Sequence, residues 1–124
     1  MIVIDIATRW IRAEYVRWQR RMRGLFERWR PPYRLRVVDG DSLPPVVPVG
    51  ALVLARDEGE DWCVGMKCPC GCGRTIELLL IPEAKPRWSL SLDLTGLPSL
   101  SPSVFLRDGC RSHFWLKRGR VIWS

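Results

Sequence analysis

Hydrophobic and polar positions follow two different periods along this chain of 124 residues. Over residues 4–30 the stripe positions recur at alternating steps of four and three, which aligns them along one side of a helix. The stripe consists of Ile4, Thr8, Ile11, Tyr15, Trp18, Met22, Leu25 and Trp29, widened by Trp10, Val16 and Phe26. Pro31-Pro32 ends the pattern, because the residue before a proline avoids the α region. The sequence therefore predicts a long N-terminal amphipathic α-helix over residues 4–30.

From residue 33 onward, short β-like runs alternate with turns rich in proline and glycine. The alternation is clearest from Trp88 to Leu94, as expected for a half-buried strand. Arg118-Gly119 indicates a tight hairpin between the two runs that flank it. The remaining predicted strands cover residues 34–38, 51–55, 62–67, 74–81, 104–107, 113–117 and 120–124. The predicted fold class is mainly β, a small antiparallel sheet or open barrel, with the helix at residues 1–32 and the β domain at residues 33–124.

Charge is spread unevenly between these two parts. The net charge is +7, yet residues 1–30 hold eight arginines against three acidic residues. The β domain is nearly neutral, so nucleic-acid binding ranks last among the functions considered. The helix itself has three interpretations: packing on the domain's own core, docking a partner or a second copy, or lying on a membrane surface.

Cellular location follows from what the chain does not contain. No apolar run approaches the roughly 20 residues that cross a bilayer. The first residues lack the basic and long apolar regions of a secretory signal. We therefore expect a cytoplasmic protein, and in a reducing compartment clustered cysteines are metal ligands more often than disulfides.

Five cysteines and one histidine carry the strongest chemical signal. Three cysteines stand in Cys68-Pro69-Cys70-Gly71-Cys72-Gly73, and Cys110-Arg111-Ser112-His113 adds a thiol and an imidazole. Zinc takes four such ligands in a tetrahedron. The site is closed either by Cys68, Cys70, Cys72 and Cys110, or by Cys110 and His113 with two of the clustered thiols. An iron–sulfur cluster and reduced surface thiols are the alternatives, and Cys63 is expected to be a small buried hydrophobe. A structural zinc would stabilise the small β domain, because metal binding contributes to its folding free energy.

Several motifs together resemble a small bacterial family known only as a domain of unknown function. They are Met66-Lys67-Cys68-Pro69-Cys70-Gly71-Cys72-Gly73, Leu100-Ser101-Pro102-Ser103, Cys110-Arg111-Ser112-His113-Phe114-Trp115-Leu116 and Gly119-Arg120-Val121-Ile122-Trp123. The resemblance covers roughly residues 34–124. Members of that family occur in operons for ubiquitin-like protein conjugation, beside a ubiquitin-like protein and its E1-like activating and E2-like conjugating enzymes. The resemblance implies a role in maturing, removing or transferring the ubiquitin-like protein, and a peptidase would fit.

Peptidase chemistry could use either of two mechanisms. A zinc-activated water needs an open coordination position, which a thiolate-rich site does not favour, and no His-Glu-x-x-His pattern occurs. Alternatively, a serine acts as nucleophile with His113 as base. Ser103 is the predicted nucleophile because it lies in the stretch that matches the family, and Ser101 and Ser112 are the alternatives. Asp93 or Asp108 could orient the imidazole.

The role of His113 separates the functional hypotheses. A serine hydrolase needs His113 free of the metal, whereas a zinc-ligating His113 favours a binding module that recognises the ubiquitin-like protein or its conjugating enzyme. The sequence leaves both roles open. It also leaves Ser103 open as an ordinary turn hydroxyl beside Pro102.

Overall fold

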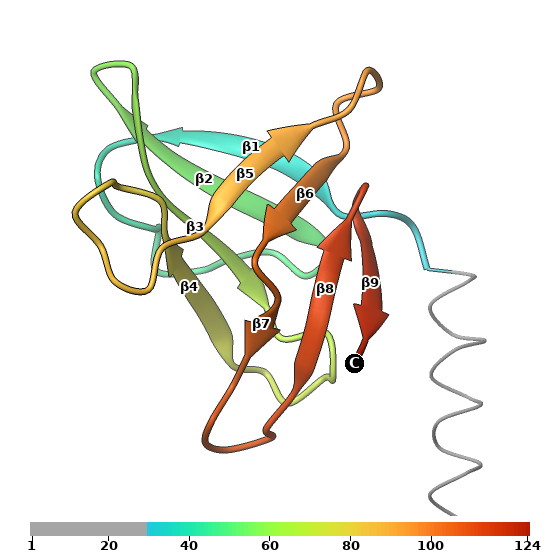
Figure 1. Cartoon of the computed structure of the whole chain (residues 1–124). Coiled ribbons are helices and arrows are strands. Elements are labelled where there is room, and N and C mark those ends of the chain that lie inside the picture. Colours follow the sequence, from blue (N-terminus) through green and yellow to red (C-terminus); the bar gives the residue numbers. More distant parts are fainter. Residues whose placement is uncertain (1–29) are drawn as a thin grey trace, which may run out of the picture. The chain divides into compact units, whose positions relative to one another are not determined.

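The computed structural model describes residues 30–124, of which residues 31–124 form one compact unit. This part of the chain contains strands connected by turns and loops (Figure 1). The strands are β1 (Arg34–Asp39), β2 (Ala51–Asp57), β3 (Glu60–Lys67), β4 (Thr75–Leu79), β5 (Ser89–Leu92), β6 (Pro98–Ser101), β7 (Val104–Phe105), β8 (His113–Lys117) and β9 (Arg120–Trp123). No helix of the described residues is long and apolar enough to span a membrane.

The predicted fold class, a mainly β domain with a long N-terminal helix, is wrong for the structure as described. Residues 30–124 contain no helix, and the fold class is all-β. The predicted helix, with the partner docking or self-association assigned to it, falls on residues outside the described part except for Arg30. Arg30 lies in a bend, consistent with the two prolines that follow it.

The sheets are also not purely antiparallel. The strands form a four-stranded sheet in the order β1-β2-β3-β4, a two-stranded sheet β5-β6 and a three-stranded sheet β7-β8-β9. The first pair, β1 and β2, is parallel, which requires residues 40–50 to cross back over the sheet. All other pairs are antiparallel.

The crossover of residues 40–50 covers one face of the four-stranded sheet. Val47 packs there with Ala51 and Val53 of β2, and Leu43 packs against them. A Cβ atom at Gly65 would collide with the Leu43 side chain, so a larger residue in β3 would displace Leu43 where the crossover lies against the strand. Strand β2 is therefore apolar on both faces, and Ala51–Ala55 are all buried.

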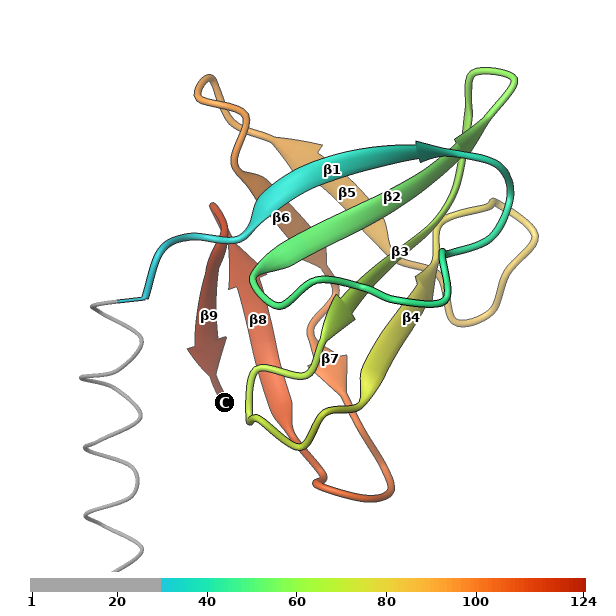
Figure 2. The same cartoon turned by 180° about the vertical axis from the view of Figure 1, so that it is seen from behind.

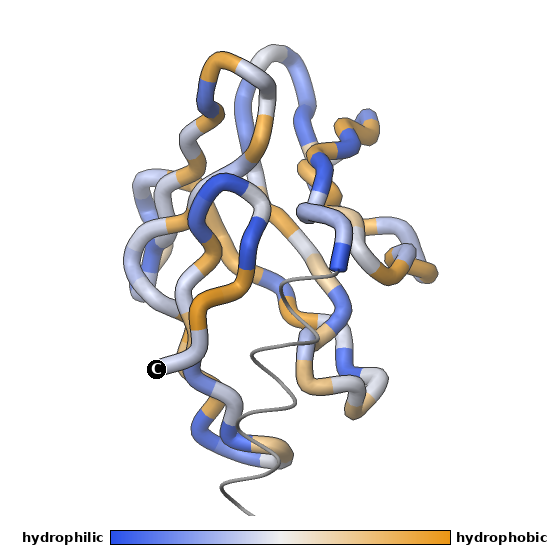
Figure 3. Tube along the Cα trace, turned by 90° about the vertical axis from the view of Figure 1, so that its right-hand side faces the viewer, coloured by the Kyte–Doolittle hydropathy of each residue, from blue (hydrophilic) through white to orange (hydrophobic). Residues whose placement is uncertain are grey.

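The opposite face of this sheet packs on the two smaller sheets. Figure 1 and Figure 2 show the four-stranded sheet as one layer and β5–β9 as the other. The core between them takes Leu54, Val64 and Met66 from the first layer, and Phe114 and Leu116 from the second. Hydrophobic and hydrophilic residues are interleaved along the chain (Figure 3), and in β4 and β8 buried positions alternate with exposed or partly exposed ones, as expected for strands with one face on the core.

The β8–β9 hairpin is held in place at its tip. Arg118 and Gly119 have φ angles of 49° and 75°, the positive values that a two-residue hairpin turn needs. The Gly119 amide donates to the Pro98 carbonyl at 2.7 Å, and the Gly119 carbonyl accepts from the Tyr33 amide at 2.7 Å. The bond to Pro98 holds the end of β8 beside the start of β6, so the start of β8 lies close to the segment that follows β6.

Candidate active site and metal centre

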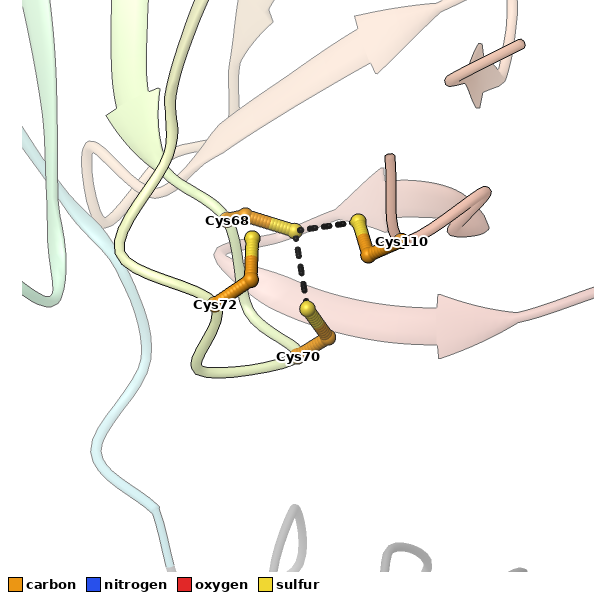
Figure 4. A group of neighbouring side chains, drawn as sticks. All are labelled: Cys68, Cys70, Cys72 and Cys110. Carbon is orange, nitrogen blue, oxygen red and sulfur yellow. Dashed lines mark hydrogen bonds between the residues drawn. The ribbon is translucent and has the colours of Figure 1, made fainter. Parts of the chain in front are cut away.

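Four cysteines converge where β3 ends. The sulfur atoms of Cys68, Cys70, Cys72 and Cys110 all lie within 4.8 Å of one another (Figure 4). Cys68 Sγ lies 3.4 Å from Cys70 Sγ and 3.7 Å from Cys110 Sγ. All four thiols are free, and four cysteines so close together could hold a metal ion.

The turn after β3 positions three of these sulfurs. The Cys68 amide donates to the Arg74 carbonyl at 2.8 Å, so the ladder between β3 and β4 continues by one bond. The Gly71 amide then donates to the Cys68 carbonyl at 3.1 Å and closes a tight turn. Gly71 and Gly73 have φ angles of 90° and 83°, which side chains with a Cβ rarely adopt. The glycines between the cysteines thus allow the chain to curl around one point.

The loop between β7 and β8 supplies the fourth sulfur. An ion pair joins this loop to the first one, because Arg74 Nη1 lies 2.7 Å from Asp108 Oδ1. The hydrogen bond from Arg74 lowers the pKa of Asp108. Ser112 is buried, and its Oγ lies 3.3 Å from Cys110 Sγ and 3.7 Å from Cys68 Sγ. Ser112 therefore belongs to the cysteine cluster.

The surroundings give two of these thiols opposite proton affinities. Hydrogen bonding to Ser112 lowers the pKa of Cys110 to about 6. Burial raises the pKa of Cys68 to about 12. A cysteine binds a metal as its thiolate. Cys110 is therefore largely in the ligating form at neutral pH, whereas the Cys68 thiol would lose its proton only on binding a cation.

The fifth cysteine stands apart from the cluster. Cys63 pairs with Ala55 inside the four-stranded sheet and is 1% exposed. Burial raises the pKa of its thiol to about 11. Cys63 is thus a buried apolar side chain, as predicted.

Ser103 and His113 are in contact at the start of β8. Ser103 follows β6 and precedes β7, and His113 is the first residue of β8. Ser103 Oγ lies 2.9 Å from His113 Nε2. In the tautomer protonated on Nδ1, the serine hydroxyl donates to Nε2, which is the bond that a nucleophile makes to its general base. The hydrogen-bonded pair and the four-cysteine group are therefore separate in this structure.

Pairing between β7 and β8 produces this contact. Phe105 is the direct partner of His113 across the two strands, so both side chains point to the same face. Their rings meet edge to face, with centroids 5.1 Å apart and an interplanar angle of 65°. The Phe105 ring thus supports the imidazole from the side.

The other predicted participants lie elsewhere. Ser101 is exposed and pairs with Ser89 across the β5–β6 hairpin, and Ser112 lies on the cysteines. Asp93 Oδ1 accepts hydrogen bonds from Thr95 and from the Leu97 amide, so it closes the β5–β6 turn. Asp108 is paired with Arg74. Within residues 30–124, no carboxylate hydrogen-bonds the His113 ring.

Three residues that contact the serine–histidine pair or the cysteine loops were not predicted from the sequence as part of either site. Phe105 packs on the imidazole, and Arg74 joins the two cysteine loops. The Trp88 indole N–H donates to the Ser103 carbonyl at 3.4 Å and links β5 to the serine. Phe105 alone had a signal in the sequence, since it stands two positions after Ser103 within a predicted strand.

The described part of the chain is thus a small all-β protein with a serine–histidine pair beside a four-cysteine cluster. A family described as "Bacterial ubiquitination-like system serine protease (BubE)" matches residues 40–124. The match covers more than half of the chain, and the chain belongs to this family. It also agrees with the resemblance to a family of ubiquitin-like conjugation operons. No curated protein and no solved structure matches the chain.

Proposed function

We propose that this protein is a serine hydrolase that cuts the bond between a ubiquitin-like protein and the group attached to its C-terminus. The observation that carries the proposal is the 2.9 Å contact between Ser103 Oγ and His113 Nε2. The family description supports it, because it names a serine protease of a ubiquitination-like system. The substrate would be a precursor or a conjugate of the ubiquitin-like protein, and the E1-like and E2-like enzymes are partners in the same pathway.

The reaction follows from the two side chains. Ser103 Oγ attacks the carbonyl carbon of the scissile bond while His113 Nε2 takes the hydroxyl proton. His113 then donates this proton to the leaving amine or alcohol, which departs and leaves an ester on Ser103. A water molecule then attacks the ester while His113 takes its proton. His113 passes this proton to Ser103 Oγ as the ester bond breaks, which frees the new carboxylate and restores the serine and the neutral imidazole. Phe105 keeps the imidazole in position through its edge-to-face contact.

We further propose that Cys68, Cys70, Cys72 and Cys110 hold a zinc ion. Tetrahedral zinc with Zn–S bonds of about 2.3 Å places sulfur atoms about 3.8 Å apart. The distances of 3.4 Å and 3.7 Å from Cys68 Sγ fit this geometry. A bound zinc would offset two of the four negative charges of the thiolates and lock the two loops together. His113 follows Cys110 by three residues, so a fixed Cys110 helps to place the imidazole.

The test uses a fluorophosphonate probe, which reacts with nucleophilic serines, together with cleavage of a conjugate of the ubiquitin-like protein. The wild type should take the label and cut the conjugate, and Ser103→Ala should do neither. Ser101→Ala is the matched control, since Ser101 lies two residues away and is exposed. Labelling of Ser103→Ala would contradict the assignment. Binding of the ubiquitin-like protein by a wild type that neither labels nor cleaves would instead indicate a non-catalytic binding module.

A further inference from the structure

The outer face of the β7–β8–β9 sheet is apolar around His113. Trp115 pairs with Ile122 and Phe105 pairs with His113, so these side chains share one face. The opposite face holds Phe114, which is buried in the core. Phe105 is 56% exposed and Ile122 is 48% exposed. Large apolar side chains gathered on an exposed sheet face are typical of an interaction surface.

The rim of this face is basic. Residues 103–124 contain five basic residues and a single acidic one, Asp108. Asp108 is already neutralised by Arg74, 2.7 Å away. Lys117 and Arg120 pair across the hairpin, and Lys117 Nζ lies 5.1 Å from the centre of the Trp115 ring. The aromatic side chain and the positive charge therefore form one continuous surface.

We propose that this surface, the β7–β9 face defined by Phe105, Trp115, Lys117, Arg120 and Ile122, docks the ubiquitin-like part of the substrate. The matching partner surface is apolar at its centre and carries carboxylates at its edge. The inference rests on the proposed function, because it places the substrate of that reaction. It deepens that function by assigning recognition to residues other than the serine–histidine pair.

Continuity with His113 is the main argument for this occupant. His113 lies on the same face as Trp115, two positions along β8, so a protein docked on the face has its attached end beside Ser103. The excess of positive charge favours a partner with carboxylates and speeds its approach. An aromatic side chain in the centre of a face is the usual source of affinity between proteins.

Two other arrangements are outcomes of the test. Single-stranded nucleic acid also binds surfaces with aromatic and basic side chains. The substrate could instead occupy the open pocket of about 470 Å³ beside Trp88, which Ser89 also lines. Each arrangement predicts a different set of sensitive residues.

The experiment measures binding of the ubiquitin-like protein to the Ser103→Ala variant by fluorescence anisotropy, so that no substrate is consumed. Adding Ile122→Glu should raise the Kd at least about tenfold, because a carboxylate then faces the apolar centre and the acidic rim of the partner. Arg120→Glu should raise it about threefold or more, with a weaker effect at high salt. Val46→Glu, at an exposed apolar residue of the crossover loop, is the control and should leave the Kd unchanged.

Three results would overturn the inference. They are no binding of the ubiquitin-like protein, a loss caused by Ser89→Glu and not by Ile122→Glu, and displacement from the face by a single-stranded oligonucleotide. Circular dichroism and thermal melting verify that each variant is folded.

Hydrolysis of a small phenyl ester, measured with an intact Ser103, separates this inference from the proposed function. Ile122→Glu should lower kcat/KM for conjugate cleavage more than kcat/KM for the ester, which is too small to occupy the docking face. If the wild type cannot hydrolyse it and Ile122→Glu still weakens binding, the hydrolase fails and the docking face stands. If the ester is hydrolysed and Ile122→Glu leaves binding unchanged, the docking face fails and the hydrolase stands.

Discussion

The serine–histidine pair and the four-cysteine cluster both include residues of the segment 103–113, yet they are assembled over very different stretches of chain. Ser103 and His113 are ten residues apart, and the pairing of β7 with β8 brings them together. Cys68 and Cys110 are 42 residues apart and come from opposite layers of the fold. The pair therefore depends on local strand register, whereas the cluster depends on the packing of the whole domain. Substitutions that break the cysteine cluster should therefore disturb the serine–histidine pair more than substitutions in the pair disturb the cluster.

The largest expected effect separates the two sites directly. His113→Ala should lower kcat/KM for conjugate cleavage by about a thousandfold, because the serine loses its base. Its zinc content per chain should equal that of the wild type, because the four cysteines form a group without His113. Kinetics and elemental analysis of the same preparation check both statements. Loss of the metal would show that His113 is a ligand and would remove the hydrolase mechanism.

Removal of the metal should act on the whole domain. A strong chelator, or Cys110→Ser, is expected to lower the free energy of unfolding by about 3–4 kcal/mol, as for a ligand present at several hundred times its Kd. Urea denaturation with and without chelator measures the change. Cys63→Ala is the control that keeps its metal, since Cys63 lies outside the cluster. Equal unfolding curves with and without chelator would refute a structural metal.

Alkylation then distinguishes the thiols within the cluster. At pH 7.5, folded metal-free protein should react with iodoacetamide at Cys110 at least about tenfold faster than at Cys68. The reason is that the pKa of Cys110 is about 6 and that of Cys68 about 12, so only the first is a thiolate at this pH. Peptide mass spectrometry at several times gives the rates. Metal-loaded protein should be protected at both residues, and uniform labelling of all five cysteines would contradict the described surroundings.

The smallest effect concerns the support of the imidazole. Phe105→Ala should lower kcat for a small ester by a factor of roughly 2–10, which corresponds to the 0.5–1.5 kcal/mol of an aromatic edge contact. Phe105→Tyr keeps the ring and should restore the rate. Leu92→Ala, at another exposed apolar strand residue, is the control. A rate unchanged by Phe105→Ala would show that β8 alone positions His113.

Local patterns in the sequence were sufficient for most strands and for the hairpin at Arg118-Gly119. They were insufficient for β6, because Pro98-Ser99-Leu100-Ser101 carries a proline and small polar residues that favour turns. The parallel pairing of β1 with β2 was also missed, since the alternation within a strand does not specify its neighbour. It depends on where residues 40–50 pack, and that is a tertiary contact.

For the candidate site, too, local patterns predicted one part of the arrangement and tertiary contacts decided the other. Spacing alone predicted that Cys68, Cys70 and Cys72 lie close together and that Cys110 could join them, because glycines allow the turn between the first three. Spacing did not decide between the two partners of His113, which could have faced either the sulfurs or a serine. That choice depends on the register in which Phe105 lies opposite His113. Asp93 and Asp108 were the carboxylates considered as partners of the His113 ring. In the structure Asp93 closes a turn and Asp108 forms an ion pair with Arg74, which are common uses of exposed carboxylates.

The short distance between Cys110 and His113 has a genetic consequence. The two residues between them connect a cysteine of the cluster to a strand whose side chains alternate between core and surface. An in-frame insertion or deletion of a single codon here would turn His113 toward the core and Phe114 toward the solvent, or displace Cys110. Arg111 is exposed with a φ angle of 52°, so glycine or asparagine should be accepted there. Natural variation in this segment should thus alter its residues but never its length.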